Sequence, residues 1–224
     1  ENINPNYFGL TYSINDESDN PGCESYIKMR NSYSGSVFSD KSEIENIKVT
    51  AVHEFFHAIQ FGYNCWEDFW FMEATAVWSE DELYNNINDL YRYLAQWFSN
   101  PNTSIETEGY HMYGTFIFFK YIDEHLGGPE TIKNSWQYSN QLAIENDGVS
   151  IQAIDKALKD VNSSFDETYH RMRIANRILS SNENAGIYSY EEAEEYLDSA
   201  EVAYPPPQNS IIFKEGNHKI ISSS

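Results

Sequence analysis

Two histidines four residues apart constrain this chain more than any other feature of its sequence. They are His53 and His57, in the sequence Val-Thr-Ala-Val-His-Glu-Phe-Phe-His-Ala-Ile-Gln. On a helix, side chains four residues apart project from the same face, one turn apart. Val52, Phe56 and Ile59 recur at helical spacing in the same segment. They predict that this segment is a helix with one apolar side buried.

Two imidazoles on one helical face are a metal-binding arrangement. Both can reach a single Zn²⁺ at about 2.0–2.1 Å. Glu54 lies on the flank of the same face, where a carboxylate can take a proton from an attacking water molecule. This is the H-E-x-x-H arrangement of metallopeptidases. A catalytic zinc site has three protein ligands, so the third must come from elsewhere in the chain.

The best candidate for the third ligand is Glu73, sixteen residues after His57 in Trp-Phe-Met-Glu-Ala-Thr-Ala. That gap fits the end of one helix, a turn, and the first turn of an antiparallel partner helix. Glu80 and Asp81 are the alternatives, and both also suit groups that orient a histidine or charges that face solvent. No third histidine follows at the short spacing of the metzincin pattern, which disfavours a three-histidine site.

Together, the His53–His57 motif and the Trp70-Phe-Met-Glu73-Ala-Thr-Ala segment resemble the gluzincin clan of zinc peptidases, as in the bacterial collagenase type. More closely, the stretch 49–81 resembles a group of exported prokaryotic metalloprotease-like proteins. The resemblance implies that His53, His57 and Glu73 hold the metal and that Glu54 is the general base. The spacer between the two motifs is shorter than in many gluzincins. The exopeptidase motif Gly-x-Met-Glu-Asn is absent, which favours an endopeptidase.

A further group is expected to steady the oxyanion that forms during peptide hydrolysis. The segment Gly-Tyr-His-Met-Tyr-Gly-Thr contains Tyr110, His111 and Tyr113 at the predicted start of a helix. Peptidases of the resembled type commonly have a Tyr-Gly helix start at a similar place. His111 or Tyr113 is therefore the candidate catalytic donor, whereas Tyr110 is expected to pack against the helix.

The pattern of apolar residues predicts an α+β fold, with a small partial N-terminal β-sheet, the metal-binding helix and a mostly helical C-terminal lobe. The resemblance implies that this fold is of the gluzincin (thermolysin-like) type. One catalytic domain is expected over 1–204, divided into a β-containing part with the metal-binding helix (1–62) and a helical lobe (63–204). A Pro-rich segment with a β-hairpin at Ile211–Ile221 follows in 205–224. Strands are expected at Tyr7–Tyr12 and Ser25–Met29. Helices are expected over about 42–62, Phe69–Tyr84, Asn88–Phe98, His111–Leu126, from Pro129 onward, Ser150–Lys159, Phe165–Leu179 and Glu191–Leu197.

The net charge of the chain limits the classes of partner that it can bind. The chain has 14 basic and 35 acidic residues and a formal net charge of −21, which disfavours nucleic acid and anionic membranes. It contains no apolar run long enough to span a membrane, and its start at Glu1 fits a processed or excised chain. Cys23 and Cys65 could pair in an exported protein, but their spacing alone leaves this open. We expect an extracellular or cell-surface location.

These patterns lead to one principal hypothesis and two alternatives. The principal hypothesis is a zinc-dependent endopeptidase that acts on a peptide or protein substrate. The first alternative is a secreted, zinc-bearing binding or adhesion module without catalysis. The second is a calcium-stabilised scaffold, prompted by the acidic loop Asn15–Asn20. The sequence leaves substrate preference and oligomeric state open.

Overall fold

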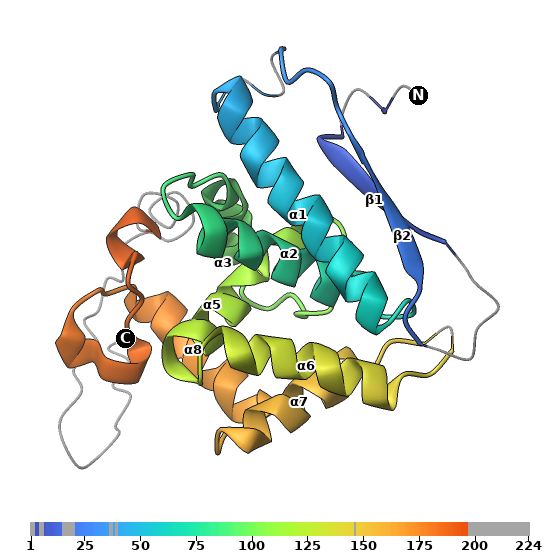
Figure 1. Cartoon of the computed structure of the whole chain (residues 1–224). Coiled ribbons are helices and arrows are strands. Elements are labelled where there is room, and N and C mark those ends of the chain that lie inside the picture. Colours follow the sequence, from blue (N-terminus) through green and yellow to red (C-terminus); the bar gives the residue numbers. More distant parts are fainter. Residues whose placement is uncertain are drawn as a thin grey trace.

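A computed structural model describes residues 3–4, 7–14, 21–35, 38, 40–145 and 147–196. Over these residues the protein is a mixed α+β structure, mostly helical, with a small two-stranded sheet (Figure 1). The elements, in chain order, are β1 (Gly9–Ile14), β2 (Glu24–Met29), α1 (Glu43–Tyr63), α2 (Phe69–Tyr84), η2 (Leu90–Tyr93), α3 (Leu94–Ser99), α4 (Tyr110–Gly114), α5 (Phe116–His125), α6 (Pro129–Leu142), α7 (Ser150–Asp160), α8 (Phe165–Ile178) and η3 (Glu183–Tyr188).

The sheet is an antiparallel pair that lies along α1. Its register runs from Gly9 opposite Met29 to Ile14 opposite Glu24. Both strands contact α1, and Figure 1 shows them side by side with that helix. The two predicted strands are thus confirmed, with the first shifted two residues toward the C-terminus. The sheet places β1 against the face of α1 that carries the histidines.

A disulfide between Cys23 and Cys65 links the residues just before β2 to the turn that follows α1, and its Cα atoms are 5.8 Å apart. Backbone hydrogen bonds reinforce the junction, because the Cys23 amide donates to the Phe61 carbonyl at 2.8 Å. Gly22 is required for this approach, since a Cβ at that position would lie 2.3 Å from the Gly62 carbonyl oxygen. The junction therefore fixes the sheet against the C-terminal end of α1.

The helix that carries the two histidines, α1, begins at a capping box. The Ser42 hydroxyl accepts from the Glu45 amide, while the Glu45 carboxylate accepts from the Ser42 amide. The buried stripe of this helix differs from the predicted apolar side, because Ile59 is 42% exposed. The residues that are buried are mostly polar: Asn46, Val49, Thr50, Glu54, His57 and Gln60. A polar stripe can be buried here because hydrogen bonds to other elements satisfy it.

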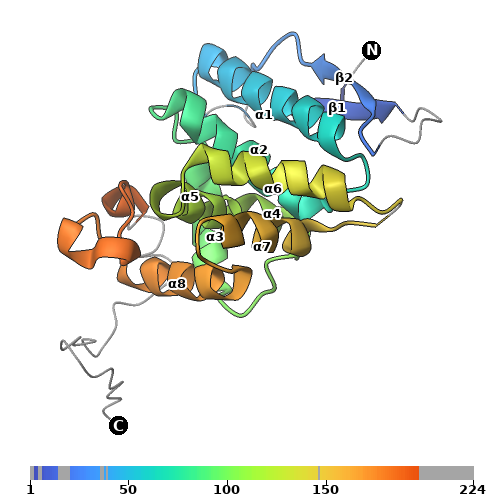
Figure 2. The same cartoon turned by 60° about the horizontal axis from the view of Figure 1, so that its bottom comes forward.

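The central helix of the molecule is α2, which is buried over most of its surface. It packs against α1 on one side and against α4 and α5 on others. Its aromatic residue Phe71 is fully buried and stacks on Trp136 of α6 with ring centroids 4.2 Å apart. Figure 2 shows α2 between the layer formed by α1 with the strands and the layer formed by α7 and α8. Because α2 is enclosed by other helices, its position is fixed by the core.

Two of the predicted helices are divided in the structure. The helix expected over Asn88–Phe98 starts as the 3-10 turn η2 and continues as α3. The helix expected over His111–Leu126 is interrupted at Thr115, whose amide bonds to the carbonyls of both His111 and Met112. The 3-10 segment η3 was not predicted, and a helical turn is present at 193–196.

The remaining expectations from the sequence fall on other parts of the chain. The hairpin expected at Ile211–Ile221, the Pro-rich segment before it and the Asn15–Asn20 loop lie outside the described residues. Among the described residues, no helix is both long and apolar enough to cross a bilayer.

Candidate metal centre

Three ligand atoms from two helices converge on one point. His53 Nε2 lies 3.0 Å from His57 Nε2 and 3.1 Å from Glu73 Oε2, and His57 Nε2 lies 3.6 Å from the same oxygen. Ligands at about 2.0–2.1 Å around a tetrahedral Zn²⁺ are roughly 3.3 Å from each other. The observed separations bracket that value. Within the described parts of the chain, this is the one group of three or more side chains arranged to hold a metal ion.

The second nitrogen of each imidazole is held by an oxygen acceptor. His53 Nδ1 lies 2.7 Å from Glu80 Oε1, and His57 Nδ1 lies 2.7 Å from Gln60 Oε1. The Gln60 amide orientation is fixed, because its Nε2 donates at 2.8 Å to the Met72 carbonyl and to the Thr75 hydroxyl. Each Nδ1 is therefore assigned the proton, which leaves both Nε2 lone pairs facing the ligand position.

The charges of the cluster favour a bound cation. Burial alone would lower the pKa of the His53 imidazole, but the carboxylates of Glu73 and Glu80 raise it well above its usual range. Burial alone would likewise raise the pKa of Glu73, but the two histidines hold it well below its usual range. The carboxylates beside the two imidazoles thus make this position favourable for positive charge.

The position of Glu54 is set by contacts with β1. Its Oε2 accepts a 2.7 Å hydrogen bond from the Thr11 hydroxyl, which also lies 2.8 Å from the Glu54 carbonyl oxygen. A Cβ at Gly9 would lie 2.7 Å from Glu54 Cγ and 2.8 Å from a methyl of Thr50. The glycine therefore provides the space in which this carboxylate lies. Glu54 is buried, and it lines the same cavity as the three ligands.

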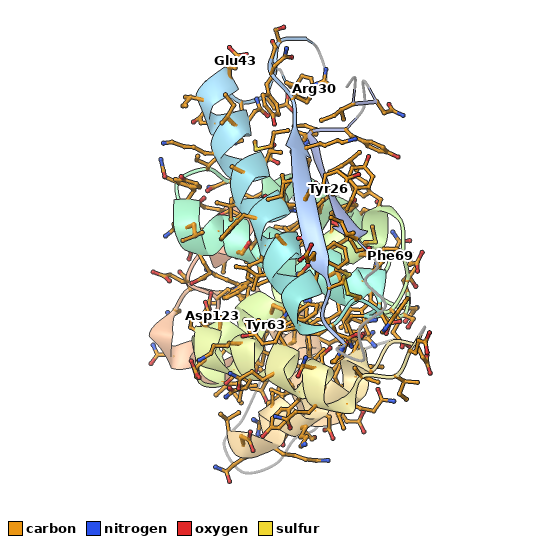
Figure 3. The ribbon with its side chains drawn as sticks, turned by 45° about the vertical axis from the view of Figure 1, so that its right-hand side comes forward. Tyr26, Arg30, Glu43, Tyr63, Phe69 and Asp123 are labelled. Carbon is orange, nitrogen blue, oxygen red and sulfur yellow. A yellow bond between two sulfur atoms is a disulfide. The ribbon has the colours of Figure 1, made fainter. Side chains whose placement is uncertain are left out.

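The cavity in front of the ligands has a volume of about 620 Å³. Its walls come from β1, α1, α2, η2 and α4. Figure 3 shows α1 from Glu43 to Tyr63, with Tyr26 on the strand beside it and Phe69 at the start of α2. A cavity of this size can accommodate several residues of an extended peptide or a small-molecule ligand.

The structure separates the two candidates for the oxyanion donor. Tyr113 lines the cavity, and its ring centroid lies 6.5 Å from that of His53. Burial raises the pKa of the Tyr113 hydroxyl, which keeps its proton available for donation. His111 instead stacks on Trp97 at 4.6 Å and is not one of the residues that line the cavity. Its buried Nε2 has no hydrogen-bond partner among the described residues.

The alternatives for the third ligand occupy other positions. Glu80 contacts the far nitrogen of His53, as an orienting group would. Asp81 accepts a 2.6 Å hydrogen bond from Lys120 of α5. Two contributors were missed from the sequence, Gln60 and Thr11. Gln60 follows His57 by three residues, a spacing that lets the two side chains meet on one helix. Nothing in the local sequence signals Thr11, which lies 43 residues from Glu54.

Compared with known proteins, the chain matches no family model, no curated protein sequence and no solved structure. The gluzincin resemblance therefore stays a prediction, and the geometry of the site has to carry the functional argument.

Proposed function

We propose that this protein is a zinc-dependent peptidase with a gluzincin-type site and fold, acting as an endopeptidase. The observation that carries the proposal is the convergence of His53, His57 and Glu73 beside a fourth side chain, Glu54, in one cavity. A structural zinc site has four protein ligands, whereas three ligands and an adjacent carboxylate are typical of hydrolytic sites. Two imidazoles and one Glu carboxylate are also a known donor set of catalytic zinc sites.

Each residue has a defined part in this mechanism. Zn²⁺ held by the three ligands would supply Lewis-acid chemistry to the cavity. Glu54 accepts a proton from the attacking water and delivers it to the leaving amine. The Tyr113 hydroxyl donates a hydrogen bond to the oxyanion that develops on the peptide carbonyl. Glu80 and Gln60 hold the imidazole rings in the orientation that binding requires.

The Cys23–Cys65 disulfide supports an extracellular or cell-surface location in this proposal. Disulfides persist in oxidising compartments and are rare in the cytosol. The formal charge of −21 is in keeping with a soluble, exported enzyme whose substrates are neither nucleic acids nor anionic membranes.

The direct test is Glu54→Gln, assayed for zinc content and for cleavage of a mixed peptide pool by mass spectrometry. The proposal expects one zinc per chain and a rate loss on the order of 10²–10⁴-fold. The matched control is Glu130→Gln on α6, where the side chain is 63% exposed. Full activity in Glu54→Gln would refute the base assignment. Zinc binding without any cleavage by the wild type would favour the non-catalytic binding module instead.

A further inference from the structure

Three exposed aromatic side chains line the cavity in front of the candidate metal ligands. Tyr7, Phe69 and Tyr110 are 49%, 60% and 47% exposed, and all three line that cavity. They come from three separate segments: the residues before β1, the start of α2 and the start of α4. Large aromatic residues that converge on one exposed concave site are typical of a binding surface. We call these three residues the aromatic rim.

A continuous row of rings leads from the aromatic rim to the metal ligands. The Tyr110 ring lies 5.1 Å from the Tyr93 ring, which stacks on Tyr113 at 5.1 Å. Tyr113 in turn lies 6.5 Å from the ring of His53. A side chain that enters the cavity along this wall would contact aromatic faces over the whole distance to the metal centre.

The charged groups of the cavity are predominantly acidic. Glu54, Glu73, Glu80 and Asp89 contribute four carboxylates, and Arg92 is the one Lys or Arg among the described lining residues. The Arg92 guanidinium forms an ion pair with Asp89. A divalent ion at the ligands would still leave negative charge in excess, and the chain as a whole carries −21. An anionic ligand is therefore repelled, and a cationic one is attracted.

The position of Arg92 shows that aromatic rings lining this cavity accept a cation. Its guanidinium carbon lies 5.3 Å from the ring centroid of Phe8 and 5.5 Å from that of Tyr93. Both distances are within the range of about 6 Å over which an aromatic face attracts a cation. The rings of the rim have the same chemistry but remain exposed, so they are available to a cation from another molecule.

We propose that the cavity selects peptides with a Lys or Arg side chain near the bond to be cleaved. The aromatic rim and the four carboxylates of the cavity hold that basic side chain. Cleavage of these peptides rests on the proposed peptidase function, whereas the preference for binding them does not. Aromatic faces and carboxylates together favour a basic side chain over a neutral one of similar length, and over an acidic one most strongly.

The experiment measures binding without turnover. Three peptides with a neutral fluorophore carry an uncleavable ketomethylene group in place of one central peptide bond and are identical except for Lys, norleucine or Glu beside it. They are titrated with the zinc-loaded wild type, which keeps all four cavity carboxylates, by fluorescence anisotropy. We expect the Lys peptide to bind on the order of tenfold more tightly than the Glu peptide, with norleucine between them. The difference should shrink as NaCl is raised.

Variants of the rim locate the effect. Phe69→Ala and Tyr110→Ala should each bring the Lys and norleucine peptides closer to equal affinity. The control is Tyr26→Ala, because Tyr26 is 43% exposed on β2 but lies outside the cavity lining. Equal affinities for the three peptides, no binding of any, or unchanged preference in both rim variants would each overturn the inference. Selective binding, with no cleavage of the same peptides carrying an ordinary peptide bond by the zinc-loaded wild type, would instead overturn the proposed peptidase function alone.

Discussion

Gln60 offers the sharpest perturbation of the metal centre that leaves every ligand in place. Its Oε1 accepts the proton on His57 Nδ1 at 2.7 Å, and its side chain is fully buried. Replacing it by Leu keeps a similar volume but removes the hydrogen bond that orients that ring. Loss of such an orienting partner weakens metal binding by about 10–100-fold. That range corresponds to about 1.4–2.8 kcal/mol of binding free energy.

The assay is zinc competition against a chelating dye at fixed pH, with the free energy of unfolding of the metal-free protein measured in parallel. The matched control is Thr75→Val, which removes a hydroxyl that Gln60 Nε2 contacts but leaves the His57–Gln60 bond intact. We expect the control to lose about 1 kcal/mol of stability with its zinc affinity unchanged. If Gln60→Leu folds and binds zinc as tightly as the wild type, then Gln60 does not orient His57 and this reasoning is wrong.

Three further predictions follow from other contacts. Thr11→Val should lower kcat while zinc content stays unchanged, because the hydroxyl that positions Glu54 is lost. Thr11→Ser keeps the hydroxyl and should restore activity, so equal rates in the two variants would show that Thr11 does not position Glu54. Lys120→Met should cost about 3–5 kcal/mol in urea unfolding, because it leaves the buried Asp81 carboxylate unpaired; a loss below 1 kcal/mol would contradict this. Burial lowers the pKa of His111 below that of the unfolded chain, so the unfolded state takes up the proton first and stability falls as pH drops below about 6.5. His111→Gln should remove that part of the pH dependence of stability and leave activity intact. An unchanged slope of stability against pH in this variant would refute the assignment of the effect to His111.

The convergence of the three candidate ligands was predictable because it depends on local spacing. His53 and His57 share a helical face whatever the rest of the fold does, and Glu73 lies one short turn away on the next helix. The capping box at Ser42 and the strands also follow from local sequence preferences.

The features that sequence could not provide all depend on contacts between distant segments. The Thr11–Glu54 hydrogen bond joins residues 43 apart, and the disulfide joins residues 42 apart. The buried side of α1 was predicted only in part for the same reason, because Phe56 packs against the core whereas Ile59 is exposed. The polar residues of this helix are buried by partners on other elements, while Phe55 remains 60% exposed. His111 and Tyr113 could not be distinguished either, because the choice depends on which of them Trp97 covers.

The measurement that tests the central claim most directly is zinc binding by the wild type and by Glu73→Ala, with Glu130→Ala as a surface control. Elemental analysis gives the stoichiometry, and chelator competition gives the affinity. We predict one zinc per chain in the wild type and the control, and an affinity loss of about 100-fold or more in Glu73→Ala. A wild-type protein that takes up no zinc after reconstitution, or a Glu73→Ala variant that binds it unchanged, would contradict the metal centre described here.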